Sequence, residues 1–367
     1  MELNKIHENF GNFQRERAFE LLKLVEQAHD RYNESLKAKG EGDVNPISID
    51  NCIEKDGKSE CYSEYKDITK SPYKVLSNLV FTQIDWLSIK TLFKRKLLFG
   101  FVVRNIDTSD IYVVFRGTAS LGEWISNVKF IQQSYTTISG GDLSGETHWG
   151  FRRTYERPET YGRSPAEVRK ILWVTRWFDR VFLTGARPMK DIIETTLIKE
   201  CPPGTPKQRI FITGHSLGGA LATLATSHII KLIDDNKISA SPPILYTFAS
   251  PRVGDSVFAN NFSKLEECYR IANSEDIVPK IPIPTLLLIA GRTPPKSGTL
   301  SLIQTLLLIA GRTPPKSDAL SFVQKLNSKV DFQHIGLPIY FTEQKKTVSD
   351  NHTIPVYLDA LKPLNHS

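Results

Sequence analysis

A serine between two glycines is the first feature of this sequence whose residue types could do chemistry. The segment Gly214-His215-Ser216-Leu217-Gly218 follows an apolar run at 210–213 and precedes a run of small, helix-forming residues. A serine on a tight turn between a strand and a helix exposes its hydroxyl, and the helix N-terminus offers backbone N–H groups to a developing oxyanion. The pattern predicts a nucleophile elbow at Ser216, and a serine in an ordinary strand-to-helix turn is the alternative.

A carboxylate suited to the same chemistry occurs later in the chain. Residues 268–272 are predicted as a short strand, and the loop after them contains Glu275 and Asp276. Loops at the carboxyl ends of parallel strands are where α/β folds place their catalytic groups. Asp276 is the better candidate because the apolar residues 277–279 would bury one side of its carboxylate and fix its direction. The alternative is that both acids are solvated, as loop carboxylates commonly are.

Two downstream histidines compete for the role of general base, which is needed because a neutral hydroxyl is a poor nucleophile. His334 lies in residues 330–341, whose β-branched and aromatic residues predict paired strands around a Gly-x-Pro turn. His352 lies in the polar segment 349–355, just before a predicted amphipathic helix at 356–361. A histidine inside a strand is more often a packing residue, whereas a loop can orient an imidazole freely. We therefore predict His352 as the base.

With these residues the chain resembles a known family, the class 3 (fungal-type) triacylglycerol lipases and their bacterial and plant phospholipase relatives. The resemblance runs through most of residues 15–362. It implies an α/β-hydrolase fold with Ser216 as nucleophile, His352 as base and Asp276 as the acid that orients the base. It also matches His334 to a non-catalytic strand. The matching blocks are residues 112–118, 123–125, 148–151, 214–220, 248–254, 276–279 and 350–352, with Tyr357 and Leu358 after the last.

The block ending in Arg116-Gly117-Thr118 follows a continuous apolar strand predicted at 110–115. Gly117 lets the chain turn at once, which brings Thr118 to the mouth of the site. The backbone N–H groups of Thr118 and Leu217 are predicted to form the oxyanion hole. Arg116 is predicted to make a structural pair rather than to bind substrate.

The segment after this threonine resembles a lid, here at about residues 119–127 with Trp124 as its bulky apolar residue. A short helix of this kind can cover the serine in water and open on a lipid surface. A tryptophan that packs in the core is an equal alternative from these residues alone.

The elements that must position these groups are predicted from hydrophobic periodicity. Apolar residues recur every three or four positions over 15–36, which predicts an amphipathic helix on the outer face of a sheet. Residues 38–60 are rich in Gly, Asp and Lys and predict a solvated loop. Strands that alternate with helices such as 219–234 favour a central, mostly parallel sheet covered on both faces. The predicted strands are about 99–104, 110–115, 209–214, 243–248, 268–272 and 331–341.

The 367 residues are predicted to form a single α/β-hydrolase domain with its core at about 15–362, because the family blocks are spread along the chain. Insertions are predicted at about 157–189, with an aromatic-rich helix candidate at 171–183, and at about 283–326. The second contains a tandem repeat, since units 285–304 and 305–324 differ at only four positions. A passive surface loop is the simpler interpretation. The alternative is that its Leu-Leu-Leu-Ile-Ala runs, beside Arg and Lys, contact a membrane interface.

Charge and cysteine content limit the partners. The 47 basic and 40 acidic residues give a net charge of +7, which permits contact with an anionic membrane surface, but no basic run is dense enough to indicate nucleic acid. Cys52 and Cys61 could pair across a short loop, although reduced thiols fit an intracellular protein better. No signal peptide or transmembrane helix is predicted, so we expect a cytoplasmic protein that can also contact membranes peripherally. The sequence has no metal or cofactor signature.

These residues together predict hydrolysis of a lipid acyl ester through an acyl-enzyme on Ser216, which water cleaves with His352 as base. They do not rank triacylglycerol, phospholipid and galactolipid as substrates. Two alternatives stay open. One is a catalytically impaired hydrolase scaffold that binds lipid or a protein partner, which is expected only if the insertions block the site. The other is acyl transfer to an alcohol other than water.

Overall fold

The computed structural model describes residues 12–37, 52–55, 58–61, 72–88, 91–117, 132–134, 145–156, 159–161, 187–281, 332–347 and 349–363. Its helices are α1 (Arg15–Lys37), α4 (Trp149–Glu156), α6 (Met189–Glu200), α7 (Leu217–Asp234), α8 (Ser256–Asn260) and α12 (Ile354–Leu361), with short 3-10 turns η2 (Val278–Lys280) and η3 (Asp350–His352). Its strands are β1 (Cys52–Lys55), β2 (Lys58–Cys61), β3 (Tyr73–Ser88), β4 (Thr91–Asn105), β5 (Ile111–Phe115), β6 (Gln132–Ser134), β7 (Glu146–His148), β8 (Glu159–Tyr161), β9 (Ile210–His215), β10 (Ile244–Phe248), β11 (Cys268–Asn273) and β12 (Leu337–Phe341).

An eight-stranded sheet forms the centre of the fold, in the order β12-β11-β10-β9-β5-β4-β3-β8. Neighbours from β5 to β12 pair in parallel, whereas β4 is antiparallel to both β5 and β3. β9 and β11 are buried along their whole length, as strands in a sheet covered on both faces must be. The predicted mostly parallel sheet is therefore confirmed. Because the parallel strands share one direction, their carboxyl ends meet at one edge, which we call the catalytic edge.

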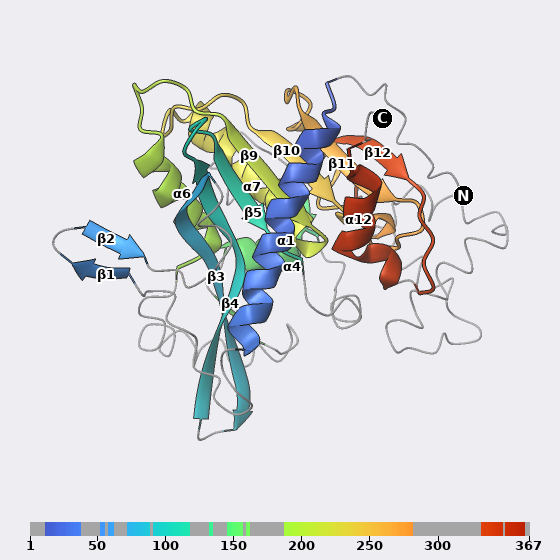
Figure 1. Cartoon of the computed structure of the whole chain (residues 1–367), viewed down its shortest axis with the longest axis horizontal. Helices are drawn as coiled ribbons and strands as arrows, with labels where there is room; N and C mark the ends of the chain where they lie inside the picture. Colours follow the sequence, from blue (N-terminus) through green and yellow to red (C-terminus); the bar gives the residue numbers. More distant parts are fainter. Residues whose placement is uncertain are drawn as a thin grey trace.

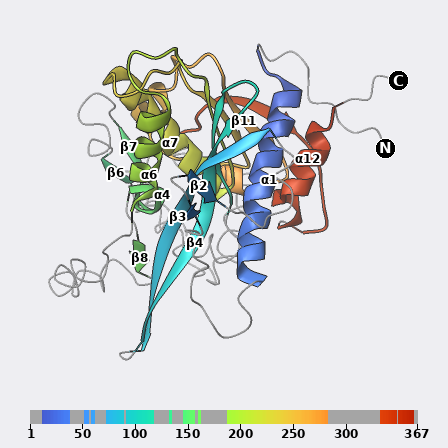
Figure 2. The same ribbon diagram turned by 60° about the vertical axis from the view of Figure 1, so that its left-hand side comes forward.

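Helices cover both faces of the sheet (Figure 1, Figure 2). α1 crosses one face beside α12, and its apolar side, with Leu21, Leu22 and Val25, is buried in one hydrophobic cluster. α4, α6 and α7 lie over the opposite face, where they share a second cluster with the sheet. The helices predicted at 15–36, 219–234 and 356–361 are confirmed, and each observed end lies within two residues of the predicted end. Among the described helices, none is both long enough and apolar enough to cross a bilayer.

The antiparallel half of the sheet differs from the sequence prediction. A strand was expected only at 99–104, but β4 begins at Thr91 and pairs with the unpredicted β3 over almost its full length. The loop expected at 38–60 is also wrong in part, because β1 and β2 form a small antiparallel hairpin in which Cys52 and Cys61 are register partners. Polar residues within these strands hide the alternation that identifies a strand, since pairing with a partner strand decides their conformation.

The strand predicted at 331–341 is shorter than expected. β12 begins only at Leu337, and the segment before it makes a single bridge from Gln333 to Gly254. Gly336 has φ +87°, a left-handed conformation that interrupts an extended chain. His334 therefore precedes the strand and does not belong to a strand pair.

Several predicted features lie outside the described residues. They include Thr118, the lid segment 119–127 with Trp124, the helix candidate at 171–183 and the tandem repeat at 285–324. In the first predicted insertion, the structure describes β8 and the start of α6. It describes no residue of the second predicted insertion.

Candidate active site

Ser216 occupies the sharp turn between β9 and α7. It has φ +59°, which is rare for a residue with a side chain, and it is the N-cap of α7. The turn closes because the flanking residues are glycines. A Cβ on Gly214 would lie 2.2 Å from the Gly218 carbonyl oxygen, and a Cβ on Gly218 would lie 2.4 Å from the Arg116 carbonyl oxygen. The structure thus has the strand–elbow–helix geometry predicted for Ser216.

His352 lies between the serine hydroxyl and a carboxylate. Its Nε2 is 2.7 Å from Ser216 Oγ, and its Nδ1 is 2.7 Å from Asp276 Oδ2. All three side chains are buried, and Asp276 has no exposed surface. With Asp276 ionised, Nδ1–H donates to the carboxylate and Nε2 accepts the hydroxyl proton of the serine. Such an arrangement can remove the proton from Ser216 as the oxygen attacks an electrophile.

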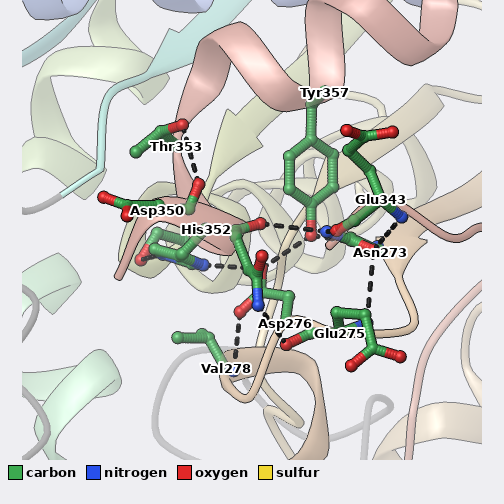
Figure 3. Close-up of polar contacts among 11 residues, drawn as sticks. Asn273, Glu275, Asp276, Val278, Glu343, Asp350, His352, Thr353 and Tyr357 are labelled. Atoms are coloured by element: carbon green, nitrogen blue, oxygen red, sulfur yellow. Dashed lines mark hydrogen bonds and ion pairs between the residues drawn. The ribbon is translucent and has the colours of Figure 1, made fainter. Parts of the chain in front are cut away.

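Three donors surround the Asp276 carboxylate (Figure 3). Oδ1 accepts the backbone N–H of Val278 at 2.9 Å, and Oδ2 accepts hydrogen bonds from His352 and from the Tyr357 hydroxyl, the latter at 2.7 Å. A buried carboxylate is costly unless its oxygens are hydrogen-bonded. These contacts therefore hold Asp276 in one orientation, whereas the neighbouring Glu275 makes none of them.

Tyr357 was not among the predicted site residues. Its ring is fully buried on α12, and its hydroxyl also accepts the N–H of Asn273 at 3.1 Å. Burial, reinforced by the Asp276 charge, raises the pKa of Tyr357 well above its ordinary value, so the hydroxyl keeps its proton and donates it to the carboxylate. The amphipathic pattern of 356–361 predicts that this tyrosine is buried, but not which polar group it meets.

Two asparagines connect the strand end that precedes Asp276 to the turn that contains His352. Asn273 Nδ2 donates to the Glu343 carbonyl at 2.8 Å and to the Asn351 carbonyl at 3.2 Å. Asn351 Nδ2 in turn donates to the Glu275 carbonyl at 3.1 Å. His352 thus belongs to the 3-10 turn η3 rather than to an open loop, and its backbone is tied to that of the carboxylate loop. No sequence signal identified either asparagine.

His215, the residue before the nucleophile, packs against the His352 ring with 4.7 Å between ring centroids. Burial, and then the neighbouring His352, lower the pKa of His215 well below its ordinary value. His215 therefore stays neutral, and it adds no positive charge beside the imidazole that accepts the serine proton.

His334 lies outside the His352 cluster, as predicted. Its ring hydrogen-bonds to the backbone of Pro279, and burial together with Arg270 and Arg252 lowers its pKa to about 2. Arg252 donates to the Lys280 carbonyl at 2.6 Å. The two side chains therefore hold the η2 turn that directly follows Asp276.

Arg116 has the structural role predicted for it. Its side chain is 2% exposed, donates to the Leu98 and Gly117 carbonyls, and stacks over the Tyr32 ring at 3.5 Å from the centroid. Burial lowers the pKa of Arg116 to about 10. The contacts described for this guanidinium are thus all with the protein's own backbone or rings.

Leu217 is the first residue of α7, and N–H groups in a first helical turn have no acceptor within the helix. Its N–H can therefore serve as the oxyanion donor predicted beside Ser216. The second predicted donor, Thr118, lies outside the described residues. In the described part of the chain, no three His, Cys, Asp or Glu side chains are grouped so that they could hold a metal ion.

Comparison with known proteins finds lipases that are similar in sequence. Residues 112–286 match the family model for lipase (class 3). This part of the chain resembles the class 3 lipase family. The fold of the chain is the predicted α/β-hydrolase fold.

The proteins that the chain is similar to include enzymes from fungi and plants. It is 31% identical over 182 residues to a lipase of Rhizomucor miehei, which covers 49% of this chain and 40% of that protein. It is 30% identical over 190 residues to phospholipase A1-II 4 of Oryza sativa subsp. japonica, which covers 49% and 42%. The chain thus spans less than half the length of these relatives. A solved lipase from Rhizopus microsporus var. chinensis is 21% identical, covers 76% of this chain and 72% of its own, and has a TM-score of 0.39.

Proposed function

We propose that this chain hydrolyses lipid carboxylic esters through an acyl-enzyme on Ser216. The observation that supports the proposal is the position of the His352 ring, with 2.7 Å contacts to both Ser216 Oγ and Asp276 Oδ2. A serine is activated when a base lies within hydrogen-bond distance and a third group orients that base. The same contacts argue against a catalytically impaired scaffold, because a protein that only binds its partner would not need these three side chains to be aligned.

In the proposed reaction, Ser216 Oγ attacks the ester carbonyl carbon while His352 Nε2 accepts the hydroxyl proton. The resulting imidazolium is stabilised by Asp276, and the oxyanion accepts hydrogen bonds from the N–H groups of Leu217 and Thr118. His352 then donates its proton to the departing alcohol. Water, deprotonated by the same imidazole, cleaves the acyl-enzyme and releases a carboxylic acid.

The proposed substrate class is a glycerolipid ester. Similarity to class 3 lipases supports a lipid acyl ester, and the similar proteins include both a lipase and a phospholipase A1. No described side chain distinguishes a triacylglycerol from a phospholipid, so the proposal is limited to hydrolysis of the acyl ester bond. Peripheral contact with an anionic membrane is part of the same proposal.

A fluorophosphonate probe combined with Ser216→Ala tests the function. The wild-type protein should become covalently labelled and should hydrolyse a soluble short-chain ester. Ser216→Ala should lose labelling and about 10⁴- to 10⁶-fold of kcat. The matched control is Ser227→Ala, because Ser227 is also buried on α7 but its hydroxyl has no hydrogen-bond partner among the described residues. Labelling that persists in Ser216→Ala, or its absence from folded wild-type protein, would refute the proposal.

A further inference from the structure

Two arginines and a histidine gather on the face of β11 and β12 that is opposite to α1. Arg270 lies on β11 between Tyr269 and Ile271, which belong to the hydrophobic cluster shared with α1, so alternation points the Arg270 side chain to the other face. Its Nη2 donates to the hydroxyl of Tyr340 at 3.0 Å, on the neighbouring strand β12 (Figure 1). Arg270 is only 4% exposed. Its guanidinium is therefore held in the interior beside the edge strand of the sheet.

Backbone contacts bring the other two side chains to the same place. The residue before His334 forms a β-bridge with the chain two residues after Arg252. Both side chains then bond to consecutive residues of η2, Arg252 to the Lys280 carbonyl and His334 to the backbone of Pro279. After burial, the charges of Arg270 and Arg252 contribute most to the low pKa of His334. These three side chains, Arg252, Arg270 and His334, thus form one group, which we call the arginine–histidine cluster.

The arginine–histidine cluster contains buried polar atoms that the described residues leave unpaired. Nε and Nη1 of Arg270 have no hydrogen-bond partner there, and neither has Nδ1 of His334. No described carboxylate hydrogen-bonds to Arg270, whose described partner is the Tyr340 hydroxyl. A guanidinium stays charged in proteins, and buried donors of a charged group are costly when they stay unpaired. The cluster therefore has two N–H donors and a positive charge that a ligand from solution can satisfy.

His334 supplies an acceptor rather than a third donor. Its Nδ1 is unpartnered among the described residues, so the ring nitrogen that bonds to Pro279 is Nε2. Because proline has no backbone N–H, that bond is to the carbonyl, and Nε2 must donate it. The ring is neutral, since burial and the two arginines lower its pKa to about 2, so Nδ1 keeps a free lone pair. A ligand that satisfies the cluster must accept hydrogen bonds from Arg270 and donate one to His334.

We propose that the arginine–histidine cluster binds inorganic phosphate as the hydrogen phosphate dianion. The charge of this ion matches that of the two arginines, its oxygens accept hydrogen bonds from Nε and Nη1 of Arg270, and its single hydroxyl donates to His334 Nδ1. Sulfate has the same charge but no hydroxyl, and the phosphodiester of a phospholipid lacks both the second charge and the hydroxyl. Tyr340 is 52% exposed, so the cluster adjoins solvent through this ring. The bound ion would link Arg270 to the side chains that hold η2, and this inference does not depend on ester hydrolysis.

Thermal unfolding at constant ionic strength, in chloride buffer above the second pKa of phosphate, tests the site. Raising phosphate to about 100 times its dissociation constant should raise the thermal midpoint of the wild type by about 4 °C, along a saturating curve. Sulfate should bind at least about tenfold more weakly, because it has no hydrogen to donate to His334. Dimethyl phosphate, which stands in for a phospholipid headgroup, should give no saturating shift.

Replacing Arg270 with methionine should abolish the saturating shift. Without phosphate, this variant should unfold at or above the wild-type temperature, because two unpaired buried donors are gone. The matched control is Arg17→Met, since Arg17 is also mostly buried but forms an ion pair with Glu267. The control should unfold at a lower temperature in every buffer and keep the full phosphate shift. His334→Leu removes the acceptor, so it should bind phosphate and sulfate equally.

Three results would each overturn the proposal. A linear rise that phosphate and sulfate share in every variant would show only exclusion of these salts from the protein surface. A wild-type midpoint that phosphate does not change would show that the cluster is satisfied within the chain. An undiminished, saturating shift in folded Arg270→Met would place the ion elsewhere. If that variant does not fold, the comparison of phosphate with sulfate in wild type and His334→Leu decides. Ser216→Ala should keep the wild-type shift, so a failure of the proposed function leaves this site standing.

Discussion

Replacing Tyr357 with phenylalanine tests whether the site depends on a group outside the hydroxyl–imidazole–carboxylate chain. The Tyr357 hydroxyl donates to Asp276 Oδ2 at 2.7 Å and accepts the N–H of Asn273 at 3.1 Å. Phenylalanine keeps the ring, which packs edge-on against Phe341, and removes both hydrogen bonds. The substitution therefore isolates the contribution of one hydroxyl group.

The expected effects on stability and on catalysis differ in size. A hydrogen bond to a charged group contributes about 1.5–3 kcal/mol, and an N–H left unpaired in the interior costs about 1–3 kcal/mol. Because the two losses share one oxygen, we expect the free energy of unfolding to fall by about 3 kcal/mol. Asp276 keeps its bonds to His352 and to the Val278 N–H, so kcat should fall only about tenfold. Removing the carboxylate's function altogether, with Asp276→Asn, should cost about 10⁴-fold.

Urea unfolding measures the first effect, and kcat and KM for a soluble short-chain ester measure the second. The matched control is Tyr246→Phe, because Tyr246 is also a buried tyrosine that donates to a carboxylate, Glu267, at 3.2 Å. Glu267 precedes β11, so this pair lies toward the other end of the sheet. The control should lose stability and keep its kcat, and KM should be unchanged in both variants.

Two results would refute the positioning role of Tyr357. If folded Tyr357→Phe kept the wild-type kcat, the hydroxyl would contribute to stability alone. If Tyr246→Phe lost as much kcat as Tyr357→Phe, the loss would reflect general loosening of the core rather than the orientation of Asp276.

Other perturbations of the site have equally definite outcomes. His352→Ala should abolish turnover of a soluble ester, whereas folded His334→Ala should retain measurable turnover and mainly unfold at lower urea concentration; the opposite pattern would exchange their roles. Burial lowers the pKa of His215, His228 and His334 below their ordinary value near 6.5, so the unfolded chain binds protons that the folded chain does not. The free energy of unfolding should therefore be highest above about pH 6.5 and should fall below that pH, by up to about 1.4 kcal/mol per pH unit for each histidine. A urea midpoint that does not change between about pH 7 and about pH 5 would contradict this. Gly218→Ala should prevent folding or lower the unfolding free energy by at least about 3 kcal/mol, because the new Cβ meets backbone rather than a movable side chain; a thermal midpoint equal to wild type would show that the elbow can relax.

The parts of the site that the sequence predicted well are those fixed by local sterics. Gly214 and Gly218 flank Ser216 because any side chain there would collide with backbone, so the elbow is visible as a five-residue pattern. Asp276 was preferred over Glu275 because apolar residues follow it, and in the structure Ile277 and Val278 are buried beside it. The choice of His352 needed the family resemblance as well as its place before a helix.

The parts that were missed depend on contacts with other segments of the chain. β3 contains polar residues such as Lys74, Ser77 and Asn78, and only its pairing with β4 makes it a strand. Tyr357 could be predicted as buried, but its partner Asp276 is 81 residues away in the chain. Residues 331–336 have strand-forming composition, yet the left-handed Gly336 delays β12 to Leu337. Periodicity reports which face of an element is apolar and contains no information about such partners.

A long segment, which contains the second predicted insertion, separates Asp276 from His352 in the chain. The structure gives a physical reason why length there matters little. β12 pairs with β11 in an unbroken register of five residue pairs, from Tyr269 with Leu337 to Asn273 with Phe341. This pairing fixes where the chain re-enters the catalytic edge, however many residues separate the two strands, and each doubling of a loop costs only about 0.6 kcal/mol in closure entropy. From β12 to His352 only a short connection remains, and Asn273 and Asn351 tie it to the Asp276 loop. The position of His352 is thus set by sheet register and these two side chains, not by the length of the preceding segment.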